Sequence, residues 1–139
     1  MRRGLLSLLA FFLAATPAWA EKYAAISNTA MSITGDIDFV PGTITFQNGA
    51  KIHLVEVTMG QDGNWQLGGA PLPGDIFKLD PAANPKLLNG NRLCGAAVTY
   101  AAMYFLSPDD LNLNLYTGEN APSGADSDQL CATFSYEAE

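Results

Sequence analysis

Apolar and polar residues alternate in short runs along this chain, and this pattern constrains its fold more than any other feature. The clearest run reads LNLNL at residues 111–115. Successive side chains of a β-strand point to opposite faces, so residues 111–117 predict a strand with its leucines toward a core and its asparagines toward water. Residues 97–106 predict the preceding strand, and Ser107, Pro108 and Asp109 are typical of the turn between the two. On one face of that preceding strand we expect Val98, Tyr100, Ala102, Tyr104 and Leu106.

Further strands are indicated on both sides of this hairpin. Residues 37–39, 43–46 and 51–58 predict three strands, divided by the turn signals Pro41-Gly42 and Asn48-Gly49. A short strand is indicated around Trp65 and Leu67, and another at residues 76–79. Prolines exclude a long helix between residues 71 and 85, and a single helical turn is expected at 85–88. In the last strand we expect one face to carry Leu130, Ala132, Phe134 and Tyr136.

These elements predict an all-β chain with little or no helix. Short strands divided by regular turns are typical of a small antiparallel β-barrel or sandwich, here of about 7–9 strands. A closed barrel is favoured because it leaves no exposed strand edge.

The first 20 residues have the pattern of a bacterial signal peptide. Arg2 and Arg3 precede an apolar run, and Ala18-Trp19-Ala20 forms an A-x-A cleavage site. The apolar run is shorter than the roughly 20 residues that span a membrane. We therefore expect residues 1–20 to be removed, residues 21–139 to form a single β-domain without a stable membrane anchor, and the protein to be periplasmic or secreted.

The two cysteines, Cys94 and Cys131, are expected to form a disulfide. Disulfides persist in oxidising compartments outside the cytoplasm, and the spacing of this pair fits no zinc motif. The bridge would close one long loop, and the chain-entropy model predicts that this stabilises the folded state by about 4 kcal/mol.

Charge narrows the choice of partner. Without Arg2 and Arg3, five Lys and Arg remain against 14 Asp and Glu, a balance of −9. So acidic a chain is unsuited to nucleic acid or to an anionic membrane surface, because it cannot neutralise rows of phosphates. A protein partner, favoured electrostatically if basic, is expected instead.

Candidate catalytic and metal-binding residues are few. His53 is the only histidine, and no nucleophile motif accompanies it. Asp36 and Asp38 are spaced as paired carboxylates can be. A solvated strand face is the favoured interpretation, because so short a chain has few insertions from which to build a catalytic cleft. Acidic turns that could offer oxygens to calcium lack the twelve-residue loop and its closing glutamate. The sequence therefore predicts no enzyme, no cofactor and no metal site, with ordinary turns at Asp62, Asn64, Asp126 and Asp128.

Three functions suit such a chain. The first is a non-enzymatic binding or accessory module of the cell envelope, with contacts expected at loops 60–64 and 118–128 and at an exposed aromatic patch including Trp65 or Tyr116. The second is an inhibitor of a basic cell-wall hydrolase. The third is a small carrier of hydrophobic ligands, although the predicted inward Leu, Phe and Tyr side chains would fill a barrel of this size.

The inhibitor hypothesis comes from a resemblance in general layout. An export signal, a small β-domain, one disulfide and strong acidity are together loosely similar to the small periplasmic lysozyme inhibitors. That family plugs the lysozyme cleft with a Ser-Gly-x-x-Tyr loop. Here Ser123-Gly124 is not followed by such a tyrosine, so the likeness covers the layout and no motif.

Overall fold

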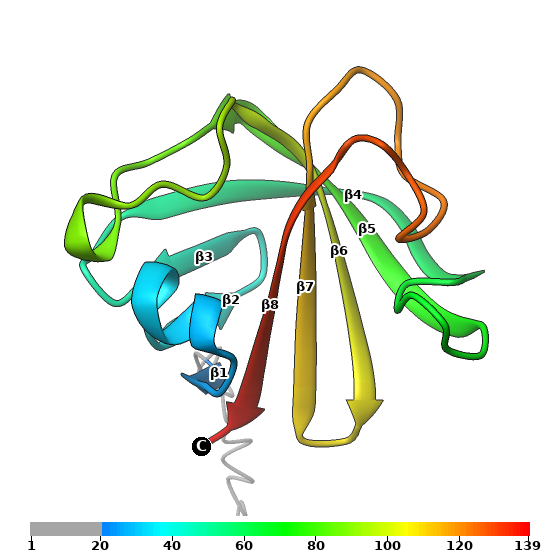
Figure 1. Ribbon diagram of the computed structural model, residues 1–139, viewed down its shortest axis with the longest axis horizontal. Helices are drawn as coiled ribbons and strands as arrows, with labels where there is room; N and C mark the ends of the chain where they lie inside the picture. Colours follow the sequence, from blue (N-terminus) through cyan, green and yellow to red (C-terminus); the bar gives the residue numbers. More distant parts are fainter. Residues whose placement is uncertain (1–20) are drawn as a thin grey trace, which may run out of the picture.

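Eight antiparallel strands form a closed β-barrel in the computed structural model, which describes residues 21–139 (Figure 1). Each strand pairs with its neighbour in sequence, and β8 pairs with β1 to close the barrel. The prediction of an antiparallel β-barrel is confirmed, whereas the predicted signal peptide lies outside the described residues. The strands are β1 (Glu21–Ala25), β2 (Ile37–Val40), β3 (Thr43–Phe46), β4 (Lys51–Gly63), β5 (Leu72–Ala83), β6 (Val98–Ser107), β7 (Asp110–Tyr116) and β8 (Leu130–Ala138).

The predicted turns join the first strands. Gly42 adopts φ 83° between β2 and β3, and Gly49 adopts φ 91° between β3 and β4. Both values lie in the left-handed region that favours glycine. The Asn48 carboxamide also accepts a hydrogen bond from the Ala50 N–H at 3.0 Å. Both hairpins are therefore specified locally by the sequence.

The middle of the chain differs from the expectation. β4 and β5 are much longer than the strands predicted at 51–58 and 76–79, and the predicted strand around Trp65 and Leu67 is instead part of their connection. Pro73 lies near the start of β5, and Pro81 lies where its register with β6 shifts, so neither ring interrupts a regular ladder. Within residues 21–139, helix is confined to a π-helical turn, η1 (Ala30–Thr34), and a 3₁₀ turn, η2 (Leu88–Gly90), which begins at the last residue of the turn predicted at 85–88.

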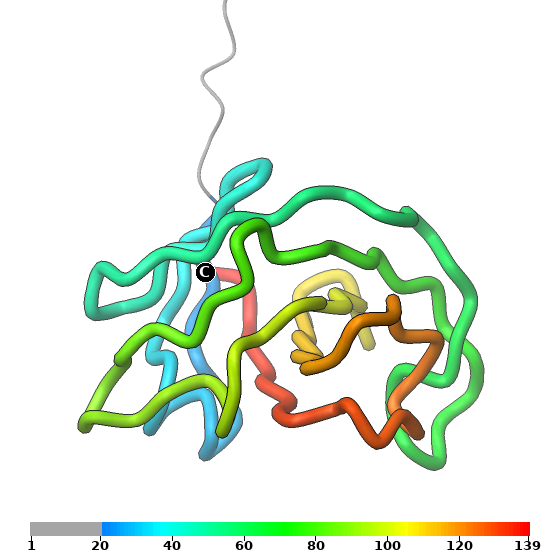
Figure 2. Tube along the Cα trace, turned by 90° about the horizontal axis from the view of Figure 1, so that it is seen from above, coloured from blue at the N-terminus to red at the C-terminus, as the bar shows by residue number. Residues whose placement is uncertain are grey.

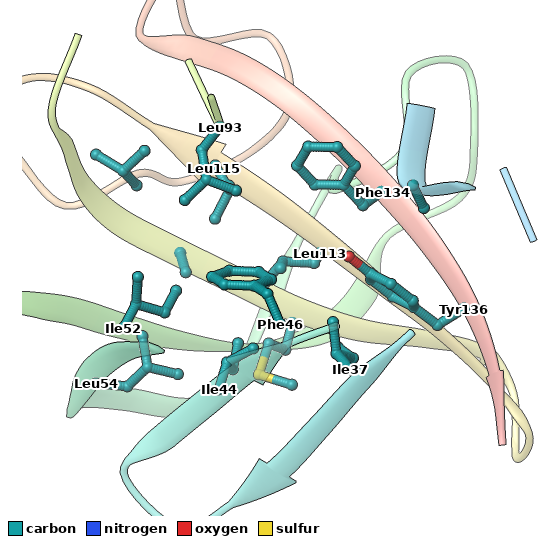
Figure 3. Close-up of a cluster of buried hydrophobic side chains, with 14 of the residues drawn as sticks. Ile37, Ile44, Phe46, Ile52, Leu54, Leu93, Leu113, Leu115, Phe134 and Tyr136 are labelled. Carbon is teal, nitrogen blue, oxygen red and sulfur yellow. The ribbon is translucent and has the colours of Figure 1, made fainter. Parts of the chain in front are cut away.

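The barrel interior is filled by apolar side chains, as expected for its size. Figure 3 shows such side chains from β2, β3, β4, β7 and β8 converging in one cluster with Leu93. Leu111, Leu113 and Leu115 are fully buried there, which confirms the inward face of β7. On the neighbouring strand β8, Phe134 is paired in register with Leu113 and Tyr136 with Leu111. The Tyr136 hydroxyl is 2.7 Å from that of Thr34.

A second, smaller core covers the outer face of β5, β6 and β7. Trp65 lies at its centre and is 1% exposed. The prediction that Trp65 or Tyr116 forms an exposed patch is therefore wrong. So is the prediction that the asparagines of β7 face water, because Asn112 and Asn114 are 5% and 0% exposed. The members of this second core are Trp65, Ile76, Ala102, Tyr104 and Tyr116.

Of the residues predicted to share one face of β6, Tyr100, Ala102 and Tyr104 do lie together at the second core, and Val98 departs from the prediction. Ala102 and Tyr104 belong to the second core, whereas Ala101 and Met103 point into the barrel with Val98. Both faces of this strand are buried because the connection after β4 covers its outer side. An all-apolar run gives no period-two signal from which the inward face could be read.

The predicted disulfide between Cys94 and Cys131 is present, with a Cα–Cα distance of 5.8 Å. It ties the connection between β5 and β6 to the first residues of β8. Within residues 21–139, no helix is long and apolar enough to cross a membrane.

Candidate binding site at the barrel mouth

The barrel wall has unequal height, and this difference opens an apolar cavity at one end of the barrel. β3 pairs with β4 only through residues 51–53, and the last contact is a hydrogen bond from the Leu54 N–H to the Gly42 carbonyl. β4 then continues to Gly63, paired with β5. Two register shifts after Glu56 bend this part of the hairpin. Figures 1 and 2 both show β4 and β5 curving away from β2 and β3.

We call the resulting cavity the barrel mouth. Its volume is about 290 Å³, close to the lower end of the range typical of small-molecule sites. Tyr23, Leu54, Phe77 and Met103 are buried and form its floor. The floor belongs to the same apolar cluster as the barrel core, so the mouth is the open end of that core. Phe39, Pro41, Gly42, Met59 and Phe105 complete its apolar lining.

Three carboxylates stand among these apolar groups. Glu21 and Glu56 are exposed, and Asp75 is half-buried. None of the twelve lining residues is a lysine, an arginine or a histidine. The mouth therefore combines an apolar floor with negative charge and supplies no positive side chain of its own.

Two of these carboxylates are held in place by hydrogen bonds. The Tyr23 hydroxyl donates to Glu21 Oε2 at 2.6 Å, and the Gly60 N–H donates to Asp75 Oδ1 at 2.9 Å. Burial, reinforced by the Glu21 carboxylate, raises the pKa of the Tyr23 phenol well above its usual value. Tyr23 therefore stays neutral at physiological pH and acts as a hydrogen-bond donor at the floor.

This arrangement is suited to a cation with an apolar body. Aromatic faces attract cations, methionine adapts to the shape of a ligand, and carboxylates supply charge-assisted hydrogen bonds. The volume of the mouth accommodates a side chain or a small amphiphile, while the barrel beyond is filled by apolar side chains.

The residues considered for catalysis do not meet at this mouth. His53 is exposed on the outer side of β4, with its Nδ1 3.5 Å from the Thr43 hydroxyl. Asp36 accepts a hydrogen bond from the Ala25 N–H at 2.9 Å, which is a structural role. Asp38 is half-buried on β2, paired in register with Lys22.

The two loops expected to make contacts instead pack against each other. Asn64 and Gly124 form an isolated parallel bridge, and the Ala125 N–H donates to the Asn64 carbonyl at 2.8 Å. The Tyr116 hydroxyl donates to the Gly124 carbonyl at 2.8 Å, so Ser123-Gly124 is tied to the second core. In the described part of the chain, no three of the His, Cys, Asp and Glu side chains are placed to hold a metal ion, and this includes Asp62, Asp126 and Asp128.

Sequence reasoning missed the mouth. Its residues come from five strands, and their proximity depends on where β4 leaves β3. The one local signal is the mixed run VEVTM at residues 55–59, in which apolar residues alternate with polar ones after the strand has left its neighbour. Alternation alone does not tell an open edge from a paired one.

Compared with known protein families, curated protein sequences and solved structures, the chain shows no match.

Proposed function

We propose that this protein is an exported, non-enzymatic binding module of the bacterial cell envelope, and that the barrel mouth is its binding site for a cationic group with an apolar body. The observation that carries the proposal is the mouth itself: an apolar floor beside Glu21, Glu56 and Asp75, with no cationic lining residue. The sequence supports export through its signal-like first 20 residues, and the disulfide is compatible with an oxidising compartment.

The charge requirement can be tested with two small probes of the same apolar body. Phenethylamine carries a cation on a phenyl group, and phenylpropionate carries an anion on a nearly identical one. We expect the amine to shift the amide resonances of mouth residues in a saturable titration and the acid to leave them unchanged. Equal binding of both probes would reject a cation site, and binding of neither would reject the mouth as a binding site.

Variants assign the binding to the mouth. Glu56→Gln removes one rim charge with little change of shape, so it should weaken phenethylamine binding several-fold. The matched control is Glu119→Gln, which removes the same charge from an exposed position in the β7–β8 connection. If Glu119→Gln weakens binding as much as Glu56→Gln, the effect comes from net charge and not from the mouth.

An inhibitor of a basic hydrolase is a special case of this proposal, favoured by the acidic mouth and by the balance of −9 for residues 21–139. A c-type lysozyme is the natural probe. We expect binding that weakens as salt rises, because the Debye length falls from about 30 Å at 0.01 M to about 8 Å at 0.15 M. Residual lytic activity measured in parallel separates inhibition from simple association. No binding at low salt would remove lysozyme as a partner.

A further inference from the structure

The part of β4 beside the mouth has an unpaired edge. β3 accompanies β4 only as far as residue 53, and within residues 21–139 the remainder of β4 pairs with β5 alone. The Leu54 N–H points to the β3 side, where it donates to Gly42. Backbone groups of a strand alternate in direction, so those of Glu56 also face that side, where no strand follows. β4 therefore offers backbone hydrogen-bonding groups along the entrance to the mouth.

Exposed apolar side chains accompany this edge. Val55, Val57 and Met59 are 51%, 47% and 44% exposed. Edge strands of proteins are commonly protected by lysines, prolines or covering loops, because an exposed apolar edge recruits another strand. Residues 55–59 of β4 include no lysine or proline, and the two register shifts and the inward-facing Glu56 leave Val55, Val57 and Met59 exposed. Met59 also lines the mouth.

From this placement we infer that the protein binds an extended, basic segment of a partner protein by adding it as a strand to the free edge of β4, with a lysine or arginine side chain entering the barrel mouth. The inference rests on the proposed function and names the partner class for the same site. Main-chain hydrogen bonds to the edge would give affinity, and alternate side chains would reach the mouth and the outer valines.

Charge decides between a basic partner and a second copy of this chain. Glu56 and Asp62 lie on the edge strand itself, Asp75 is hydrogen-bonded to Gly60 of that strand, and Glu21 also lines the mouth. Lys78, opposite Val55 on β5, is the cation paired with this part of β4. Self-pairing would bring the carboxylates of two such edges together, which is destabilising. A segment that alternates basic and apolar residues can place its basic side chains near the carboxylates of the mouth and its apolar side chains against Val55 and Val57.

The probe is a capped six-residue peptide of alternating lysine and valine, tested on the purified protein. The same peptide methylated on two backbone nitrogens keeps every side chain but loses two donors. We expect the unmodified peptide to bind and to slow hydrogen exchange at the Glu56 amide. The methylated peptide should bind at least about tenfold more weakly, because each lost backbone hydrogen bond costs several-fold in affinity.

The outcomes separate the two proposals. If both peptides bind equally, strand addition is wrong. If phenethylamine binds and neither peptide does, strand addition is wrong and the cation site stands. If none of the three binds, the proposed function fails as well. A glutamate–valine peptide that binds as tightly as the lysine peptide would overturn the basic partner. Self-association that protects the Glu56 amide without peptide would assign the edge to a second copy.

A protein variant tests the location. Val57→Lys places a positive charge on the edge that repels the lysine peptide, so the affinity for this peptide should fall by about tenfold or more. Leu67→Lys, at an exposed apolar position (68%) in the β4–β5 connection that does not line the mouth, is the control and should have little effect. Circular dichroism of both variants checks that the barrel is intact. An equal loss in the two variants would contradict the assignment to β4.

Discussion

Asn114 shows how far a single residue can depart from its sequence pattern. The alternation in residues 111–115 identifies the inward leucines correctly, but it says nothing about what covers the other face. The Asn114 amide donates to the Trp65 carbonyl at 2.8 Å, and its oxygen accepts from the Thr133 hydroxyl at 3.2 Å. Burial is tolerated because the carboxamide is hydrogen-bonded on both sides. These partners lie far away in sequence, so no local pattern could predict them.

Asn114→Ala should therefore destabilise the protein by about 1–3 kcal/mol, because the buried Trp65 carbonyl loses its donor. Urea unfolding followed by fluorescence measures this change. Asn120→Ala, at an exposed position in the β7–β8 connection, is the control and should change the stability by less than about 0.5 kcal/mol. Equal effects of the two substitutions would contradict the role given to Asn114.

Four buried tyrosines make the stability fall at alkaline pH. Burial raises the pKa of each above the usual 10.0; they are Tyr23, Tyr104, Tyr116 and Tyr136. A raised folded-state pKa contributes stability that is fully present below the unfolded-state pKa and is lost as the pH rises. We expect the urea midpoint to be steady up to about pH 9 and to fall above about pH 10. Tyr23→Phe should make this fall less steep, and an unchanged slope would show that Tyr23 does not contribute.

At the scale of elements, the sequence predicts what is local. The hairpins at Pro41-Gly42 and Asn48-Gly49 and the strand β7 follow from turn chemistry and alternation. The length of β4 and β5 cannot be predicted in this way, because apolar runs and prolines obscure the alternation of apolar and polar residues there. The connection between them covers the outer sheet face through Trp65, and this packing explains why residues around Trp65 do not form the predicted strand.

The packing of Trp65 on β5 requires a glycine at position 74, because the indole lies directly against its Cα. A Cβ on Gly74 would lie 2.7 Å from Cε2 of Trp65, closer than real Cβ contacts allow. Gly74→Ala should displace the indole and cost about 1–3 kcal/mol, the range typical of overpacking. Gly95→Ala is the matched control, since a Cβ there meets nothing within 4 Å. A red-shifted tryptophan emission in Gly74→Ala alone would report the displacement, and unchanged emission and stability would contradict it.

At the scale of the whole molecule, the barrel has two different ends. The disulfide joins the connection before β6 to the start of β8, while the mouth lies beside Phe105, near the far end of β6. Stability and binding are therefore expected to be separable. The sequence predicts the covalent tie from two cysteines, whereas the mouth arises from the unequal lengths of β3 and β4 and has no counterpart in any single segment.

The double substitution Cys94→Ser with Cys131→Ser should reveal this separation. Removing a bridge between residues 37 apart in sequence should lower the free energy of unfolding by about 2–4 kcal/mol, because the unfolded chain regains its freedom. Well below the melting temperature, the variant should bind phenethylamine with unchanged affinity, since neither cysteine lines the mouth. Urea unfolding measures the loss of stability. Repeating it with reductant provides a control, because reductant should destabilise the protein that has both cysteines and leave the double variant unchanged. A variant that is folded yet binds much more weakly would show that the disulfide also shapes the mouth, and that the two ends of the barrel are coupled.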